Sequence, residues 1–424
     1  MRNYYLKYAN VATLKLISMG LQFLWIRELY VLSDPLIAGE YLQMYFYVGA
    51  AALIGSMGMQ EYLLREVEVA SCHYIGFLSI SGGIIGLSFV VSIPFFLLVS
   101  LLQDFVDVWP CVGVAALQIS ATLSSVRARV LGAPVIGTLF EQVVPNFLFF
   151  TFLMNRTEST SSADIIQIYF YSMAMTALLR ELMCFHTLNN RVIYRKTSNL
   201  GLGYLVRSVK ENKSVCFAFF CASLLSFIAA EFDKFLAIYL LDPAMFGFYS
   251  VGYKISILAT MGLLAFNVRS KHLFARAFKS VDAKWVSELE KEAVRVARIP
   301  PAVLLLFWSL LVPLIDLDLV GFPLEHIYSI TVVLLVFQFI SMILGPVNSV
   351  LMMGGEPMLI VYARLTATAL GIVFVLCGLY LAFDPLVLVL MYTSFAICSW
   401  KIVGSYLFWT KRGWRTGWCR VLGG

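Results

Sequence analysis

Ionisable side chains recur inside long apolar stretches of this sequence, where chemistry that needs a fixed charge would be placed. A charged residue at the centre of a membrane-spanning helix costs roughly 2.5–3.5 kcal/mol on insertion scales, and such residues usually face a cavity or a partner. Ammonium and guanidinium groups there attract anions, while carboxylates can be neutralised by a proton. The residues concerned are Lys15, Arg27, Glu28, Glu141, Arg180, Glu181, Glu231, Asp233, Lys234, Lys254, Arg364 and Lys401.

Local pairing is the alternative for several of these groups, because opposite charges stand next to each other in the chain. Arg27 and Lys234 also lie near the ends of their segments, where a long side chain can reach the membrane surface. Lys15 and Lys254 lie deeper, about two and about three helical turns into their segments. These two lysines are therefore the stronger candidates for a cavity.

The elements that hold these charges are predicted to be transmembrane helices. Of the 424 residues, 60% are apolar and only 13% are charged, against about 45–50% and about 25% in soluble domains. A span needs about 20 mostly apolar residues. Such segments give an all-α membrane protein of about twelve helices, at residues 9–31, 37–59, 75–102, 109–131, 134–154, 164–188, 214–240, 244–268, 293–315, 325–347, 357–382 and 386–409.

Other kinds of site find little support in the composition. The eight cysteines form no C-x-x-C pair and the four histidines are scattered, so we expect no metal site, no disulfide framework and no cofactor. The formal charge of +6 indicates membrane orientation and not a nucleic-acid partner.

Basic residues concentrate on alternate sides of the predicted spans. Placing the N-terminus in the cytoplasm puts most of the 31 Lys and Arg residues in cytoplasmic segments, with Arg156 as the clear exception. This positive-inside pattern predicts that both termini are cytoplasmic. In the loop at 269–292, Trp285, Leu289 and Ala293 recur at helical spacing, which fits either an amphipathic helix at the membrane surface or a solvated connector.

Two segments between predicted helices align without gaps. Residues 34–45 and 242–253 share Asp, Pro, Gly, Tyr and Tyr at an offset of 208 residues, which corresponds to six helices. An even number of crossings puts both copies on the same side of the membrane, so we expect two parallel six-helix bundles, 1–200 and 201–424. Parallel repeats of this kind are a transporter architecture, with the substrate path between the halves.

These motifs resemble those of polysaccharide repeat-unit flippases of the Wzx type, in the multidrug/oligosaccharidyl-lipid/polysaccharide exporter superfamily. The resemblance covers the layout of the whole chain, but residue-level matches are confined to short patches. The matching residues are Arg27, Asp34, Gly39 and Tyr41 around the first turn, residues 58–65 at the end of the second helix, and Asp233, Lys234, Gly247, Tyr249 and Lys254 around the seventh and eighth helices.

The resemblance implies a V-shaped exporter fold whose first, second, seventh and eighth helices line a central cavity. A cationic cavity would attract the pyrophosphate of a polyprenyl-linked sugar. Two carboxylates, Glu231 and Asp233, are the candidates for coupling transport to a proton or sodium ion. The residues expected to line the substrate cavity are Lys15, Arg27, Arg65, Lys234, Lys254 and Arg364.

The predicted function is therefore translocation of undecaprenyl-pyrophosphate-linked oligosaccharide repeat units across the bacterial inner membrane, for O-antigen or capsule assembly, by alternating access and without covalent catalysis. Expected partners are the lipid-linked oligosaccharide, the coupling ion and membrane lipid, with a polysaccharide polymerase and a chain-length regulator beside them. The alternatives are a multidrug exporter of the same superfamily, a lipid-II flippase, and, from another class, a membrane glycosyltransferase or O-antigen polymerase. Short external loops argue against the enzymes.

Overall fold

The computed structural model describes residues 2–56, 92–101, 103, 107–130, 134–156, 161–189, 213–260, 274, 277–278, 283–306, 308–309, 324–353 and 356–412. Within these ranges the regular structure is helical and no strand occurs. The predicted all-α fold class is confirmed. Backbone contacts divide the chain into two compact units, Met1–Leu224 and Leu225–Gly424, while the domain limits 1–200 and 201–424 stay a prediction.

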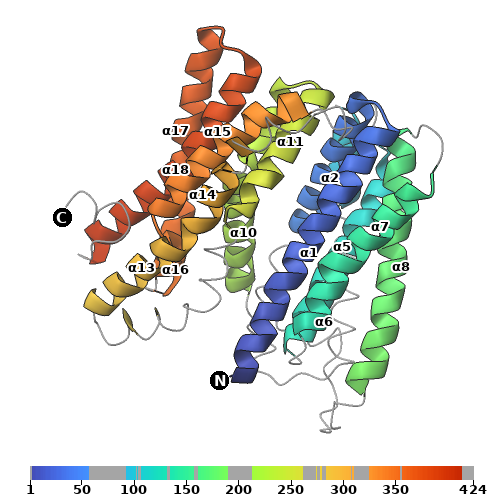
Figure 1. Ribbon diagram of the computed structural model, residues 1–424, viewed down its shortest axis with the longest axis horizontal. Helices are drawn as coiled ribbons and strands as arrows, with labels where there is room; N and C mark the ends of the chain where they lie inside the picture. Colours follow the sequence, from blue (N-terminus) through green and yellow to red (C-terminus); the bar gives the residue numbers. More distant parts are fainter. Residues whose placement is uncertain are drawn as a thin grey trace. The chain divides into compact units, whose positions relative to one another are not determined.

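The N-terminal unit is a bundle of long helices (Figure 1). Helix α1 packs against α7, α2 against α5, and α8 against both α5 and α7. The fifth predicted span begins as α-helix, widens to one turn of π-helix and continues as α-helix. The elements are α1 (Arg2–Leu32), α2 (Pro35–Ser56), α5 (Val108–Val130), α6 (Pro134–Thr138), the π-helix η1 (Leu139–Val143), α7 (Val144–Met154) and α8 (Ser162–Asn189).

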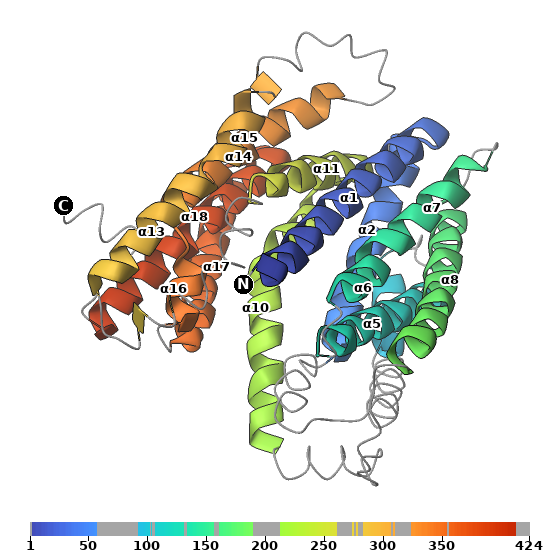
Figure 2. The same cartoon turned by 60° about the horizontal axis from the view of Figure 1, so that its bottom comes forward.

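The C-terminal unit is built around a helical hairpin of α17 and α18, against which α15 and α16 pack. Helices α13 and α14 follow one another in nearly the same direction (Figure 2). The elements are α10 (Lys213–Leu240), which begins in the N-terminal unit, α11 (Pro243–Leu258), α13 (Ala283–Ala297), α14 (Ile299–Leu306), α15 (Leu324–Ile343), α16 (Val347–Met353), α17 (Pro357–Tyr380) and α18 (Pro385–Arg412).

Each predicted span contains a helical segment among the described residues. In that part of the chain, five stretches are long and apolar enough to cross a membrane: Val108–Ser125, Val135–Met154, His326–Leu351, Met358–Tyr380 and Pro385–Lys411. The total of about twelve spans stays a prediction, because several predicted spans extend beyond the described residues.

Aspartate followed by proline starts three of the helices. The side chain of Asp34 accepts a hydrogen bond from the Leu36 amide at 2.9 Å, and that of Asp242 accepts one from the Met245 amide at 2.8 Å. Asp384 caps α18 in the same way, through the Leu386 amide at 2.9 Å. Each aspartate accepts a hydrogen bond from a backbone amide that would otherwise have no partner in the first turn. The proline after the aspartate has no amide hydrogen and needs no acceptor.

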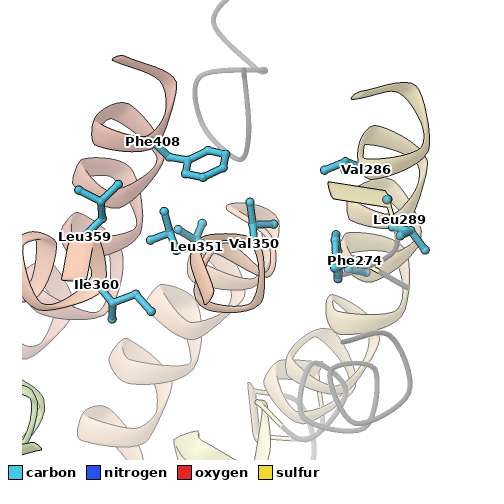
Figure 3. Close-up of a cluster of buried hydrophobic side chains, with 11 residues drawn as sticks. Phe274, Val286, Leu289, Val350, Leu351, Leu359, Ile360 and Phe408 are labelled. Carbon is cyan, nitrogen blue, oxygen red and sulfur yellow. The ribbon is translucent and has the colours of Figure 1, made fainter. Parts of the chain in front are cut away.

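The loop at 269–292 leads into an amphipathic helix, as one of the two interpretations held. The apolar face of α13 is buried, while Lys284, Glu288 and Lys291 on its other face are exposed. Val286 and Leu289 belong to one cluster of buried apolar side chains that also includes residues of α16, α17 and α18 (Figure 3). The alternative of a solvated connector is therefore wrong for α13, because this helix buries its apolar face within its own unit, while its place at a membrane surface stays a prediction.

A break between α15 and α16 interrupts the span His326–Leu351. Gly345 has a φ of 86°, a left-handed conformation that glycine adopts without strain. Pro346 follows and has no amide hydrogen to donate. The Gly345 amide bonds the Met342 carbonyl at 3.2 Å, so the Ser341 carbonyl loses the partner that a continuing α-helix would give it.

Gly371 permits the close approach of α17 to α18, and its replacement should destabilise the hairpin. A Cβ atom there would lie 2.5 Å from the buried Tyr392 ring, whereas at Gly20 it would meet nothing within 4 Å. We expect Gly371→Ala to lower the free energy of unfolding by about 1–3 kcal/mol through overpacking. Gly20→Ala should leave it unchanged or raise it by up to about 1 kcal/mol through helix propensity. Thermal unfolding in detergent measures both, and equal midpoints would contradict this account.

Candidate functional site

A cavity of about 420 Å³ lies inside the C-terminal unit. Its walls come from α10, α11, α15, α16, α17 and α18, and it includes the break between α15 and α16. A cavity of this size falls in the range of small-molecule sites, which is about 300–1,000 Å³. Its polar and charged lining consists of Asp233, Tyr253, Thr260, Gln338, Ser341, Asn348, Arg364, Thr368, Tyr392, Thr393 and Lys401.

Asp233 is the buried acid of this cavity, with 4% of its surface exposed. Its carboxylate accepts a hydrogen bond from the Tyr249 hydroxyl at 2.6 Å. The Tyr249 oxygen also lies 2.8 Å from the Thr393 hydroxyl. The chain Asp233–Tyr249–Thr393 therefore joins α10, α11 and α18, and it places three oxygen atoms together in an apolar surrounding.

The N-terminal unit holds the equivalent of this cluster, but without the acid. The offset of 208 residues pairs Tyr249 with Tyr41 and Asp233 with Trp25. The Trp25 and Tyr41 rings meet edge to face, with centroids 5.8 Å apart. The Trp25 indole donates to Asn146 at 3.1 Å. At this repeat position one unit carries an ionisable group and the other an aromatic ring.

Lys401 lies at the break between α15 and α16 and is 5% exposed. Its ammonium donates to the Ser341 carbonyl at 2.7 Å, the carbonyl that the break releases. The partial negative charge at the C-terminal end of α15 favours a cation there. Among the described residues no ion pair includes Lys401.

Arg364 and Lys401 both line the cavity, and both lie near the ring of Trp400. The guanidinium carbon lies 5.2 Å from the centroid of the Trp400 ring, and the Lys401 ammonium lies 6.0 Å from it. Both distances fall within the range of cation–π attraction. Together with Asp233, these two cations give the cavity lining two positive charges and one negative charge.

The remaining predicted site residues of this unit lie outside the cavity lining. Lys234 forms an ion pair with Glu231, one helical turn away, and its ammonium lies 4.7 Å from the centroid of the Tyr253 ring. Lys254 is half-buried. Local pairing, the alternative that the sequence left open, is what the structure shows for Lys234 and Glu231.

The predicted site residues of the N-terminal unit are not brought into this cavity. Arg27 is half-exposed and pairs with Glu28 at 2.6 Å. Lys15 is half-buried on α1, and Arg65 lies outside the described residues. Their roles in a substrate cavity stay predictions.

Sequence reasoning selected Asp233 and Arg364 but not the residues that complete the site. The sequence identifies Lys401 as a charge inside a span and Tyr249 as a residue shared by the two repeats. Neither observation alone predicts that the residue belongs to this site. Thr393 and Trp400 carried no such signal. In the part of the chain that the structure describes, no cluster of three or more His, Cys, Asp or Glu side chains could hold a metal ion.

Comparison with known proteins connects this geometry to one fold. No protein-family model matches the sequence, and a search of curated proteins finds no match. Solved structures do match over almost the whole chain. An inward-facing multidrug resistance MATE family transporter of the MOP superfamily has a TM-score of 0.64 at 14% identity, covering 95% of this chain and 94% of its own. The fold is that of a MOP-superfamily transporter.

Two further structures share this MOP fold. The eukaryotic MATE transporter AtDTX14 has a TM-score of 0.61 at 15% identity and covers 95% of this chain and 94% of its own. A MOP superfamily transporter from Pyrococcus furiosus, described by a binding pocket of reverse polarity, has a TM-score of 0.53 at 12% identity, with 99% and 96% covered. The shared fold and the five apolar stretches among the described residues support a multi-pass membrane protein.

Removing the Tyr249 hydroxyl should destabilise the C-terminal unit. Tyr249→Phe leaves the buried Asp233 carboxylate without this donor, which we expect to lower the free energy of unfolding by about 1–3 kcal/mol. The matched control is Tyr41→Phe at the equivalent repeat position, where the buried hydroxyl has no hydrogen-bond partner among the described residues. Its loss should be neutral or stabilising. Chemical unfolding in detergent measures both, and an equal loss in the two variants would refute the assignment.

Proposed function

We propose that this chain is an ion-coupled exporter that moves an amphiphilic molecule across a membrane by alternating access. The observation that carries the proposal is a cavity, inside one unit of a MOP fold, whose lining includes a buried acid, a buried lysine and a half-buried arginine. Charges placed inside a membrane protein mark substrate or ion pathways. The inner membrane of a bacterium and cytoplasmic termini, expected from the basic residues, belong to the same proposal.

Asp233 is the proposed coupling residue. A carboxylate in an apolar surrounding favours uptake of a proton or a cation, which removes its charge. The hydroxyls of Tyr249 and Thr393 lie beside it, and oxygen ligands of this kind also suit a sodium ion. Glu231 is the second candidate, but its carboxylate is already neutralised by Lys234.

Two kinds of cargo follow from different observations. The similar solved structures include multidrug resistance transporters, and they support the multidrug exporter better than the flippase. The cations of the cavity favour the second candidate, a flippase for lipid-linked oligosaccharides, since its cargo carries a pyrophosphate. The polysaccharide polymerase and chain-length regulator are partners only under the second candidate.

Deleting the gene in its native host separates the two cargos. For a multidrug exporter, the deletion strain becomes more sensitive to amphiphilic drugs and its surface polysaccharide is unchanged. For a flippase, single lipid-linked repeat units accumulate on the cytoplasmic face, as a leaflet-specific assay of the lipid-linked sugars would measure. If complementation with the intact chain reverses neither phenotype, the exporter proposal is wrong.

Replacing Asp233 with asparagine should abolish coupling while leaving the fold intact. The amide keeps the shape and can still accept the Tyr249 hydrogen bond, but it takes up no proton and attracts a cation weakly. We expect export driven by an imposed proton or sodium gradient in proteoliposomes to fall at least about tenfold, consistent with a lost charge interaction of 1.4 kcal/mol or more. The control is Asp384→Asn, an exposed helix cap that asparagine also fills well. Gradient-driven export at the unmodified rate would remove Asp233 from coupling.

A further inference from the structure

Lys401 has more hydrogen-bonding capacity than the helix end uses. An ammonium group has three N–H donors, and the contact with the Ser341 carbonyl takes one of them. The side chain also lines the cavity. Capping α15 therefore explains part of this buried charge and leaves donors for a ligand in the cavity.

Arg364 and Lys401 lie at the same level of the α17–α18 hairpin. Gly371 faces Tyr392 across that hairpin. Because the two helices run in opposite directions, Arg364, seven residues before Gly371, lies near the level of Trp400 and Lys401. The contacts of both cations with Trp400 agree with this register. We call Arg364, Trp400 and Lys401 the cationic end of the cavity.

Asp233 lies away from the cationic end. The hydrogen bonds through Tyr249 place its carboxylate beside Thr393, which follows Tyr392 and so lies near the level of Gly371. Seven residues of α-helix separate Gly371 from Arg364, a rise of about 10 Å. The acid and the cations thus occupy different parts of one cavity, and the acid does not form a close pair with Lys401.

We propose that the cationic end binds an anionic phosphate or carboxylate group, held between Arg364 and Lys401. Both side chains make strong charge-assisted hydrogen bonds to such groups. The amide side chains of Gln338 and Asn348 on the same lining add polar contacts. A cavity of about 420 Å³ fits a head group or a compact organic anion. This inference rests on the proposed function, and it narrows the cargo to an anion.

Titration calorimetry on the full-length protein in a maltoside detergent tests the charge preference. The probes are hexyl phosphate, hexyltrimethylammonium and inorganic phosphate. We expect hexyl phosphate to bind at least about tenfold more tightly than the cation, because two cations of the lining attract the phosphate and only one acid attracts the cation. Inorganic phosphate binding as tightly as hexyl phosphate would support the anion site and identify a free anion as its ligand. Binding of inorganic phosphate that is weaker than that of hexyl phosphate would also support the anion site, and would identify the head group of an amphiphile as its ligand.

Variants of the two cations test where the anion binds. Lys401→Met and Arg364→Gln should each weaken hexyl phosphate binding at least about tenfold, through loss of a charge-assisted contact. Lys401→Arg should retain most of the affinity. The control is Lys291→Met, an exposed position of α13 outside the cavity. Since Lys401→Met also removes the contact with Ser341, Arg364→Gln provides the test if that variant fails to elute as folded protein.

The inference is wrong if the cationic and anionic probes bind equally, or if neither variant changes the affinity for hexyl phosphate. Its failure can be told apart from failure of the transport proposal. Export that needs Asp233 but shows no anion preference would overturn the anion site alone. Anion binding at Lys401 in a protein that moves no cargo would overturn the transport proposal alone.

Discussion

The hydrogen bond from Tyr249 to Asp233 is the interaction on which the C-terminal unit depends. Inside a bilayer no water can satisfy a carboxylate, so its partners must come from the protein. Tyr249 provides the donor and meets Thr393 on its other side, which fixes α11 between α10 and α18. The close contact of Gly371 with Tyr392 then brings α17 against this cluster. These four helices form one part of the cavity wall, and α15 and α16 complete it.

The break at Gly345 holds the positive charge of Lys401 in the same cavity. A continuous helix would have used the Ser341 carbonyl within its own ladder, and Lys401 would have had no acceptor there. Gly345 and Pro346 interrupt the helix and leave the Ser341 carbonyl without its helical partner. That carbonyl then accepts the hydrogen bond that holds the Lys401 ammonium. Non-helical backbone at membrane depth is tolerated where it lines a cavity, which is where this break lies. One cavity can therefore attract a cation at one level and an anion at another.

Much of the fold could be predicted, because the length and hydropathy of a span depend on local sequence alone. The Asp–Pro helix starts at residues 34, 242 and 384 were also predictable, since a cap and its proline are neighbours in the chain. Pairing of Lys234 with Glu231 was visible at helical spacing. The contact of Lys401 with Ser341 was not, because it joins residues 60 positions apart and needs a break that no hydropathy pattern reveals. Arg364 could be recognised as a charge inside a predicted span, but its neighbour Trp400 follows from the register of α17 against α18.

Trp25 occupies the repeat position in the N-terminal unit that Asp233 occupies in the C-terminal unit. This difference bears on the number of ions that could be taken up per transport cycle. Two identical halves would carry two equivalent acids and could take up two ions in each transport cycle. An indole cannot change its charge, so under the proposed coupling role of Asp233 this repeat position would contribute one ion per cycle and not two. Under the proposed coupling role of Asp233, this position would supply the free energy of one ion moving across the membrane, about 2.3 kcal/mol for each 100 mV. Such a driving force sets a ceiling on how far the protein can concentrate its cargo on the far side.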